Sequence, residues 1–501
     1  MKMKIIGLAG SLRNIIQGDR AKLLKEDLKS INDLKILLEY LRLASTISRS
    51  TQFQISDTSI QTDDFKLLHH FKIKKVHKGM SNSEVALAAA LWEAWQKQID
   101  FEYISLSDYF QASQRSKNID SLKKKLVSGD AILLSGPVYF GDRGSLIQKL
   151  IDVLKRDEEI SHILRGKLFA GISIGAKRNG GQETTLIYQI LDMTSLGFIA
   201  LGNDSETTSQ YGGTCVAGDI GTIIKDEYGL NTARGVGRRL ANLLRKYNHR
   251  GELLDKLRIL FVILQDESSG TGRAYVDKLI EANSTRITAN VIDVSQLKFS
   301  YCLACDTCPN KIDIDEVYRC KIGKADDFYK IHNMFMDHDA LVPVAVSLND
   351  FNKIRTNYQT FLERTRYLRR GDYFFSDIMI APLILQEIGS MENLHIRMIT
   401  SFIRHHTVVS NPIIGYLYKN KILNENAVEK HFEFFIHDAS KLAIARLADE
   451  LMDGQFTKYN PVGYVVSPAK DQEDALNKRR IAVKKRRERL KSIAKKRIRM
   501  Y

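Results

Sequence analysis

Short apolar runs alternate with amphipathic stretches along most of the chain. Three of these runs lead into glycine or proline, as buried strands of a parallel sheet do, at residues 4–10, 130–140 and 167–175. Apolar positions at helical spacing follow each run, at residues 85–98, 144–156 and 182–197. This alternation predicts an α/β fold in which helices cover both faces of a parallel sheet.

The same pattern starts again after residue 256. The segment 338–347 matches 129–140, and 437–452 matches the helix predicted at 234–247. The repeat predicts two doubly wound α/β units in tandem. We place the first at 1–250, interrupted by an insertion at 14–79 with one helical stretch at 21–44. The second occupies 256–455, and a tail follows at 456–501.

Charge is distributed unevenly along the 501 residues, which carry a net charge of +16. Residues 478–501 hold 13 Lys/Arg and one Glu, a net +12, so the remaining chain carries only +4. This tail is rich in good helix formers and predicts a basic helix. The apolar share of 44% excludes a disordered chain. No apolar run approaches the roughly 20 residues of a membrane span, so we expect a cytoplasmic protein.

The first predicted strand leads into a loop that suits an anion. Ser11 and Arg13 follow Gly10, and Ser81, Asn82 and Ser83 begin the helix after the insertion. Backbone N–H groups at a helix start, together with hydroxyls and one cation, favour a phosphate. Neither a GxGxxG nor a Walker A motif is present.

The first unit resembles the NAD(P)H-dependent FMN reductases of the flavodoxin-like superfamily. In that family a GSxR…SxS loop holds the FMN phosphate and a PVYFG loop lies against the flavin ring. A third, glycine-containing loop completes the site. The resemblance implies two tandem flavodoxin-like domains and these cofactor-binding residues: Ser11, Arg13, Ser81, Asn82, Ser83, Pro137, Val138, Tyr139, Phe140, Gly141, Gly175, Gly180 and Gly181.

The same resemblance implies an activity. We expect an FMN-dependent oxidoreductase that takes electrons from NAD(P)H and delivers them to a quinone, a flavin or a protein, with a homodimer as the implied assembly. No catalytic acid–base residue is assigned, because the cofactor carries the chemistry. The loops of the second unit differ. Its sequence has Ala345 and Val346 at the positions that correspond to Tyr139 and Phe140 of the first unit, so we predict weak FMN binding or none there.

Four of the five cysteines fall within 19 residues, namely Cys302, Cys305, Cys308 and Cys320. Three thiolates at CxxCxxC spacing and a fourth nearby suit an iron–sulfur cluster, and tetrahedral zinc also accepts four thiolates. The segment resembles that of iron–sulfur flavoproteins, which favours [4Fe–4S] over zinc or redox-active thiols. Cys215 stands apart, and we interpret it as a packed core residue.

Two other classes of function stay open on the sequence. The chain is either an enzyme, as above, or a non-catalytic flavin and iron–sulfur electron carrier, or a scaffold protein. The scaffold hypothesis rests on the tail, whose charge suits nucleic acid, anionic lipid or an acidic protein.

Overall fold

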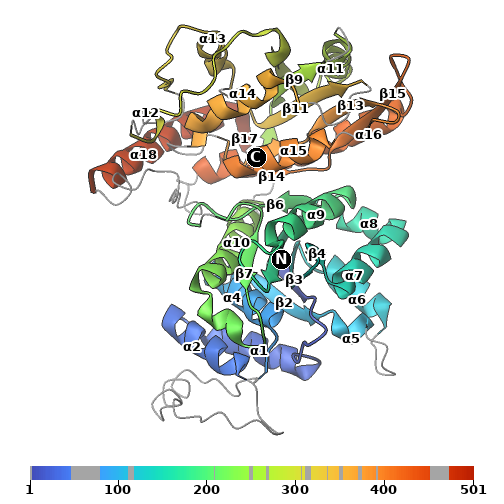
Figure 1. The fold of residues 1–501 in the computed structure, drawn as a ribbon, viewed down its shortest axis with the longest axis vertical. Coiled ribbons are helices and arrows are strands. Elements are labelled where there is room, and N and C mark those ends of the chain that lie inside the picture. The colour runs from blue at the N-terminus through green and yellow to red at the C-terminus, as the bar shows by residue number, and fades with distance from the viewer. Residues whose placement is uncertain are drawn as a thin grey trace. The chain divides into compact units, whose positions relative to one another are not determined.

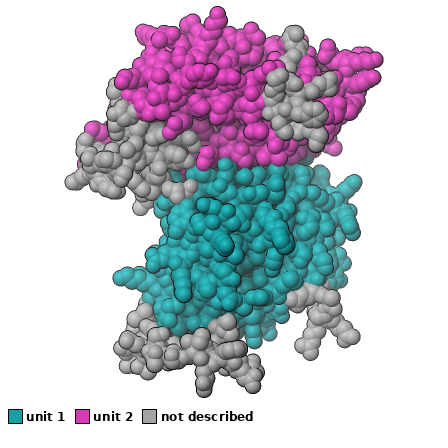
Figure 2. Space-filling view, viewed as in Figure 1, with its two compact units in different colours: residues 1–245 teal, residues 246–501 magenta. Residues whose placement is uncertain are grey.

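The computed structural model describes residues 3–46, 79–110, 118–207, 209–247, 252–266, 270–305, 307–310, 317–335, 337–348, 354–369, 375–390, 393–451 and 473–500. The chain divides into two compact units, residues 1–245 and 246–501 (Figure 2). Among the described helices, none combines the length and apolar character that crossing a bilayer requires.

Unit 1 contains a parallel sheet in the order β2-β1-β3-β5-β6, with β7 beside β5. Its strands are β1 (Lys4–Ala9), β2 (Asp100–Ser105), β3 (Ala131–Tyr139), β5 (Leu168–Gly175), β6 (Ile199–Leu201) and β7 (Gly213–Val216), with the short antiparallel β4 (Asp142–Arg143) paired to β3. This is the 2-1-3-4-5 order of flavodoxin-like sheets.

Helices lie on both faces of this sheet (Figure 1). They are α4 (Asn82–Gln96), α5 (Ser107–Phe110), α6 (Ile119–Val127), α7 (Ser145–Arg156), α8 (Glu158–Leu164), α9 (Gln182–Ser195) and α10 (Glu227–Lys246). Every residue of β5 is buried, as is most of β1 and β3. The near-continuous apolar runs of the sequence therefore reflect strands covered from both sides.

The insertion begins with two helices, not the single stretch predicted at 21–44. Helices α1 (Asp19–Ser30) and α2 (Leu34–Ser45) are separated at Ile31, and Asp33 caps α2 by accepting from the N–H groups of Lys35 and Ile36. An Asn-Asp pair favours such a break because these side chains bind nearby backbone groups. Residues 47–78 lie outside the described part.

The two insertion helices pack on the outer side of α4. The indole N–H groups of Trp92 and Trp95 donate to the carbonyl oxygens of Ile31 and Lys29, at 2.8 and 3.2 Å. Leu28, Leu37 and Leu41 are fully buried. The described helices of the insertion therefore extend the core of unit 1.

Unit 2 repeats the strand order of unit 1, as β10-β9-β11-β13-β15. Its strands are β8 (Glu252–Leu254), β9 (Leu257–Asp266), β10 (Ile287–Asp293), β11 (Ala340–Ser347), β12 (Met379–Ile380), β13 (Leu383–Glu387), β14 (Val408–Val409), β15 (Ile413–Tyr418), β16 (Lys421–Ile422) and β17 (Ile498–Met500). Its helices are α11 (Thr271–Ala282), α12 (Thr307–Asn310), α13 (Phe328–His332), α14 (Thr356–Arg364), α15 (Leu394–Phe402), α16 (Glu425–Leu451) and α18 (Glu473–Arg497).

One pair of contacts recurs at equivalent positions in the two units. Asp130 accepts from the backbone N–H of Lys4 at 2.8 Å and donates its own N–H to the Lys4 carbonyl. Asp339 does the same with Arg258, at 3.0 Å for the side-chain bond. Descent of the two units from one duplicated segment stays a prediction, which these shared contacts support.

Candidate functional site

Three loops of unit 1 meet at the carboxyl edge of the sheet, where β1, β3 and β5 lie side by side. The N–H of Gly10 donates to the carbonyl of Ser135 at 2.8 Å, which joins the first loop to β3. A Cβ placed on Gly181 would lie 2.7 Å from the Cα of Gly141, so the second and third loops are also in contact. Ligands bind at this edge of open α/β sheets.

The first loop presents Ser11 and Arg13 toward solvent and buries Asn14. Ser11 accepts the N–H of Arg13 on its hydroxyl oxygen at 3.1 Å, and the Arg13 side chain is exposed. Asn14 donates to the carbonyl of Ala9 at 2.8 Å and to Ser105 Oγ at 2.9 Å. Asn14 thus fixes the loop between two strand ends. We did not predict it, although it directly follows Arg13.

Ser81 and Glu84 form a capping box at the start of α4. Ser81 Oγ accepts from the N–H of Glu84 and donates to Asn14 Oδ1 at 2.8 Å. Glu84 is fully buried, and its carboxylate accepts from the N–H groups of Ser81, Ile15 and Ile16 and from the Tyr103 hydroxyl. This carboxylate holds the entrance and exit of the insertion together, so the cradle keeps its shape across the interruption.

The other two predicted residues of this helix start differ in burial. Ser83 is buried, and its carbonyl accepts from Ser135 Oγ at 2.9 Å. Asn82 donates from its amide nitrogen to the carbonyl of Asp219 at 2.9 Å, while its Oδ1 is buried without a hydrogen-bond partner. A buried acceptor without a partner is costly unless a ligand or water supplies a donor.

The second loop is a tight hairpin between β3 and β4. Pro137 and Val138 are half-buried, and Tyr139 pairs with Asp142 across a two-residue turn of Phe140 and Gly141. Both turn residues have positive φ, 52° and 79°, the pattern of a type I′ turn. Phe140 is fully exposed and Tyr139 is 52% exposed. A bulky residue at positive φ is strained, and strain of this kind gathers at ligand sites.

The third loop runs from Gly175 through Gly180 and Gly181 to α9. The side chain of Gln182 closes it: Oε1 accepts from the N–H of Gly180 at 2.8 Å, and Nε2 donates to the Lys177 carbonyl at 2.8 Å. Gly175 leaves room for this amide, because a Cβ there would lie 2.6 Å from Nε2. Gly181 has φ of 99°, which glycine adopts without strain.

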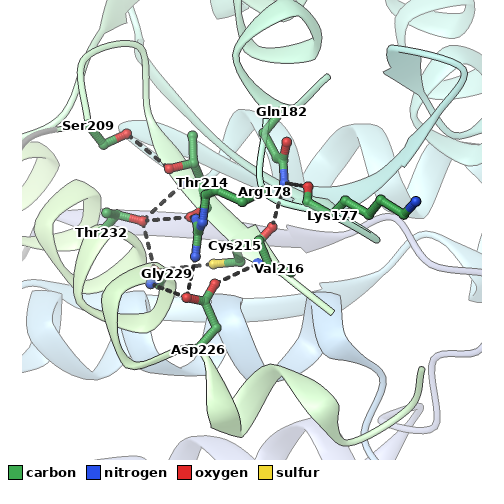
Figure 3. A network of polar contacts seen from close by, with 10 residues as sticks. All are labelled: Lys177, Arg178, Gln182, Ser209, Thr214, Cys215, Val216, Asp226, Gly229 and Thr232. Atoms are coloured by element: carbon green, nitrogen blue, oxygen red, sulfur yellow. Dashed lines mark hydrogen bonds and ion pairs between the residues drawn. The ribbon is translucent and has the colours of Figure 1, made fainter. Parts of the chain in front are cut away.

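A polar network behind this loop fixes its position (Figure 3). Arg178 donates to the Thr214 carbonyl at 3.0 Å and pairs with the Asp226 carboxylate. Asp226 also accepts from the N–H groups of Val216 and Gly229, at 2.6 and 3.0 Å. Figure 3 shows the Lys177 amine directed away from this network. No sequence motif indicated Asp226 as part of the site, because it lies 44 positions beyond Gln182 and reaches the third loop only in the folded chain.

Cys215 belongs to the same network as a packed residue. Its thiol donates to the carbonyl of Gly229 at 3.2 Å, and the side chain is fully buried. Burial raises the pKa of the Cys215 thiol well above its ordinary value. It is therefore a protonated core residue and no nucleophile.

The residues at this edge fit a phosphate-bearing flavin. The exposed Arg13 and the positive end of the α4 dipole suit the phosphate. The unpartnered Asn82 Oδ1 suits a hydroxyl donor, and the exposed rings of Tyr139 and Phe140 suit an aromatic system. None of these side chains is a strong acid or base in position for proton transfer, as expected where a cofactor carries the chemistry.

At the corresponding edge of unit 2, two described side chains bind backbone N–H groups. Asp266 accepts from the N–H of Gly272, at the start of α11, at 3.0 Å, and Gln265 accepts from the N–H of Arg355 at 3.1 Å. A carboxylate at a helix start competes with a phosphate for the same N–H groups. Residues 267–269 lie outside the described part.

Our assignment of Ala345 and Val346 to the aromatic positions of unit 2 is wrong. Both are fully buried within β11. If Asp339 is taken as the equivalent of Asp130, then Leu348 is the equivalent of Tyr139. The contiguous apolar run hid the offset, because a strand buried on both faces has no alternation to fix its register.

The four clustered cysteines are half-buried, and none is in a disulfide. Arg364 ties the two ends of their segment by donating to the Ser300 carbonyl at 2.8 Å and pairing with Asp326 at 2.6 Å. Burial raises the pKa of the Tyr318 phenol, which contacts Cys320. In the part of the chain that is described, no three His, Cys, Asp or Glu side chains gather as metal ligands. A cluster on these cysteines therefore stays a prediction.

Known proteins match the chain over parts of its length. Residues 76–205 match the family model of NADPH-dependent FMN reductases. An iron–sulfur flavoprotein of Methanocaldococcus jannaschii is 32% identical over 177 residues, which cover 33% of this chain and 91% of that protein. An NAD(P)H dehydrogenase (quinone) of Caulobacter vibrioides is 32% identical over 127 residues, covering 23% of this chain and 63% of that one.

Among solved structures, a flavodoxin, WrbA-like protein of Agrobacterium tumefaciens aligns with 32% of this chain and 88% of its own, at 22% identity and a TM-score of 0.24. The assignment of the chain to a family rests on the sequence matches and not on this structural alignment. The matched residues 76–205 include the start of α4 and the second and third loops, and the chain belongs to the family of NADPH-dependent FMN reductases and iron–sulfur flavoproteins, which are flavin-dependent oxidoreductases.

Proposed function

We propose that unit 1 binds FMN at the carboxyl ends of β1, β3 and β5 and transfers electrons from NAD(P)H to an acceptor. The observation that carries the proposal is the convergence of three loops at this edge, through the Gly10–Ser135 bond and the Gly181–Gly141 approach. The first loop lies 120 or more residues before the other two in sequence. A chance similarity to one motif does not explain why all three meet.

Each loop has a separate task in this proposal. Ser11, Arg13 and the start of α4 hold the phosphate, and Glu84 keeps those groups in place. Tyr139, Phe140 and the third loop hold the flavin ring and leave one face open to a nicotinamide. FMN supplies the redox chemistry, since it accepts a hydride and releases electrons singly or in pairs.

Quinones are the first acceptors to test. The Caulobacter relative is named for quinone reduction, which supports a quinone here, while free flavins and proteins stay open. Steady-state oxidation of NADH and NADPH, each with a soluble benzoquinone, free FMN or cytochrome c, ranks the donors and acceptors.

A glycine pair provides a sharp test of the site. Gly181→Val adds a branched side chain at positive φ against Gly141, so it forces the second and third loops apart. Gly218→Ala is the matched control, because the nearest atom to its new Cβ lies 3.9 Å away. FMN titration by fluorescence quenching should show a loss of at least tenfold in affinity for Gly181→Val and no change for the control. Equal affinities in both variants contradict the site.

The same experiments separate an enzyme from an electron carrier. A chain that binds FMN tightly but oxidises neither NADH nor NADPH is a carrier. A chain that binds no FMN at saturating concentration is neither.

An iron–sulfur cluster on Cys302, Cys305, Cys308 and Cys320 is a further part of this proposal. The spacing of the cysteines and the name of the Methanocaldococcus relative support it. Metal binding and local folding are coupled, so loading with iron would reorganise the segment. Iron and sulfide analysis of anaerobically purified protein, with Cys305→Ser beside Cys215→Ser, tests it: only the first substitution should remove iron.

A further inference from the structure

The basic tail is a docked part of unit 2, and not a free extension. Helix α18 packs along α16, with Ala494 and Ile498 buried against Leu447 and Ala448. The last strand, β17, pairs with β8 in antiparallel register, Ile498 opposite Leu254. Figure 1 shows α18 at one side of unit 2.

Buried ion pairs fix the orientation of this helix. Arg497 donates from both terminal nitrogens to the Asp339 carboxylate, at 2.9 and 2.7 Å, and pairs with Asp255 at 3.1 Å. Only 4% of Arg497 and 1% of Asp339 are exposed. Because one side of α18 is held this firmly, the opposite side presents its charges in a fixed array.

That opposite side carries its exposed cations in two groups, at residues 478–485 and 495–496. Among the described side chains of α18, six cations are exposed: Lys478, Arg480, Lys484, Lys485, Lys495 and Lys496. At about 1.5 Å per residue the stretch from Lys478 to Lys496 is roughly 27 Å long. Glu488 is the exposed acid among the described side chains of this helix.

We propose that this exposed basic face of α18 binds nucleic acid through the phosphate backbone, without reading its sequence. Successive phosphates along a strand supply a regular array of negative charge over the length of the helix. The described face carries no aromatic side chain to stack on a base. Five of its six exposed cations are lysines, which bind phosphates as point charges, so the proposal includes no base reading.

Two other anionic partners fit less well. A helix that enters a membrane surface needs an apolar face, but the apolar side of α18 packs against α16. Among the described side chains of α18, Ile481, at 55% exposure, is the exposed large apolar residue. An acidic protein would need an apolar patch at the centre of its interface, which the same face lacks. Contacts with phosphates require neither feature.

Fluorescence anisotropy of the full-length protein tests this surface. The probes are a fluorescein-labelled 20-base-pair DNA duplex and a 20-nucleotide RNA, titrated at several salt concentrations. The variant Lys484→Gln/Lys485→Gln/Lys495→Gln keeps good helix formers in place. It should weaken binding at least tenfold at low salt and flatten the slope of log affinity against log salt by about 2 to 3.

A matched variant separates a local surface from overall charge. Lys22→Gln/Lys225→Gln/Lys421→Gln removes three exposed lysines elsewhere and should bind both probes as the parent does. Circular dichroism checks that both variants keep their helix content. Equal losses in the two variants, or no binding to either probe at 50 mM salt, would overturn the proposal. So would tighter binding to phosphatidylserine vesicles or to polyglutamate than to the nucleic acids.

Discussion

At the scale of single residues, Phe140 is the position where local preference and structure disagree most. A type I′ turn favours Asn-Gly, yet the chain has Phe-Gly, with an exposed ring and a left-handed backbone. An aromatic residue at that position lowers stability and buries nothing in the structure itself. A ligand that stacks on the ring gives the arrangement its reason.

Phe140→Asn should therefore change stability and binding in opposite directions. Relief of strain should raise the free energy of unfolding by about 1 kcal/mol. FMN affinity should fall, because the ring is lost. Urea denaturation and FMN titration measure the two effects, with Tyr416→Asn, an exposed aromatic of unit 2, as the control. A variant that is both less stable and unchanged in FMN affinity contradicts the role given to Phe140.

Much of the candidate site could be predicted from the sequence at this scale, because its loops are contiguous motifs. Tyr139, Phe140 and Gly141 stand next to each other, and the strand before them fixes where they emerge. Asn14, Glu84 and Asp226 act through contacts between distant segments. Only the folded chain brings Glu84 to the N–H groups of Ile15 and Ile16, 68 or more positions away.

At the scale of elements, one carboxylate adds an ionic contact to the apolar packing of α1. Asp100, at the start of β2, pairs with the amines of Lys25 and Lys29 at 3.1 and 2.7 Å. Partial burial alone would raise the pKa of Asp100, but the two lysines outweigh it and hold that pKa at about 2. The sequence could predict a helix here, but not its partner, since nothing local links residues 25–29 to residue 100.

Asp100→Asn should destabilise unit 1 in a pH-dependent way. A carboxyl with a pKa lowered from 3.8 to about 2 adds stability above pH 4 and loses it as pH falls through 2. We expect a loss of about 1 kcal/mol at pH 7, given partial exposure and screening. The difference from the parent should fall to roughly half at pH 3.

Urea denaturation at pH 7, 4 and 3, followed by tryptophan fluorescence, measures this difference, because both tryptophans lie on α4 against the insertion. Asp277→Asn, at an exposed pair in unit 2, is the control. A difference that stays constant between pH 7 and pH 3 would show that the carboxylate charge does not hold α1 in place.

At the scale of the whole molecule, the two units share a strand order but differ in their ligand edges. In unit 1 the Glu84 carboxylate accepts from the N-cap of α4 and from the first loop, whereas in unit 2 Asp266 accepts from Gly272 within the first turn of α11. The repeated strand pattern was visible in the sequence because buried strands leave long apolar runs. The contact of Asp266 with the start of α11 could not be predicted, because Asp266 resembles any polar loop residue until its partner is known.

The protein should accordingly hold one FMN per chain. Flavin released by heat denaturation, measured against protein concentration after saturation with FMN, should give a ratio near one. Gly181→Val should bring that ratio close to zero, since it disrupts the site in unit 1. A ratio near two, or a retained ratio of one in the variant, would place flavin in unit 2.

The equivalent aspartates of the two units allow a last comparison. Asp339 balances the buried guanidinium groups of Arg446 and Arg497, while Asp130 binds only a backbone N–H among its described hydrogen bonds. Asn at position 339 removes the carboxylate that the two buried cations share and leaves Arg497 with only the more exposed Asp255 among its described ion-pair partners, which costs about 3 to 5 kcal/mol. Asn at position 130 still offers an oxygen to the Lys4 N–H, so Asp130→Asn should cost less than about 1 kcal/mol.

Far-UV circular dichroism follows both units during urea denaturation, while tryptophan fluorescence reports unit 1, where Trp92 and Trp95 lie. Asp339→Asn should shift the transition seen only by circular dichroism to lower urea and leave the tryptophan transition in place. Equal shifts in both signals would mean that Asp339 supports the stability of both units, and equal costs at the two positions would mean that the buried arginines do not depend on it.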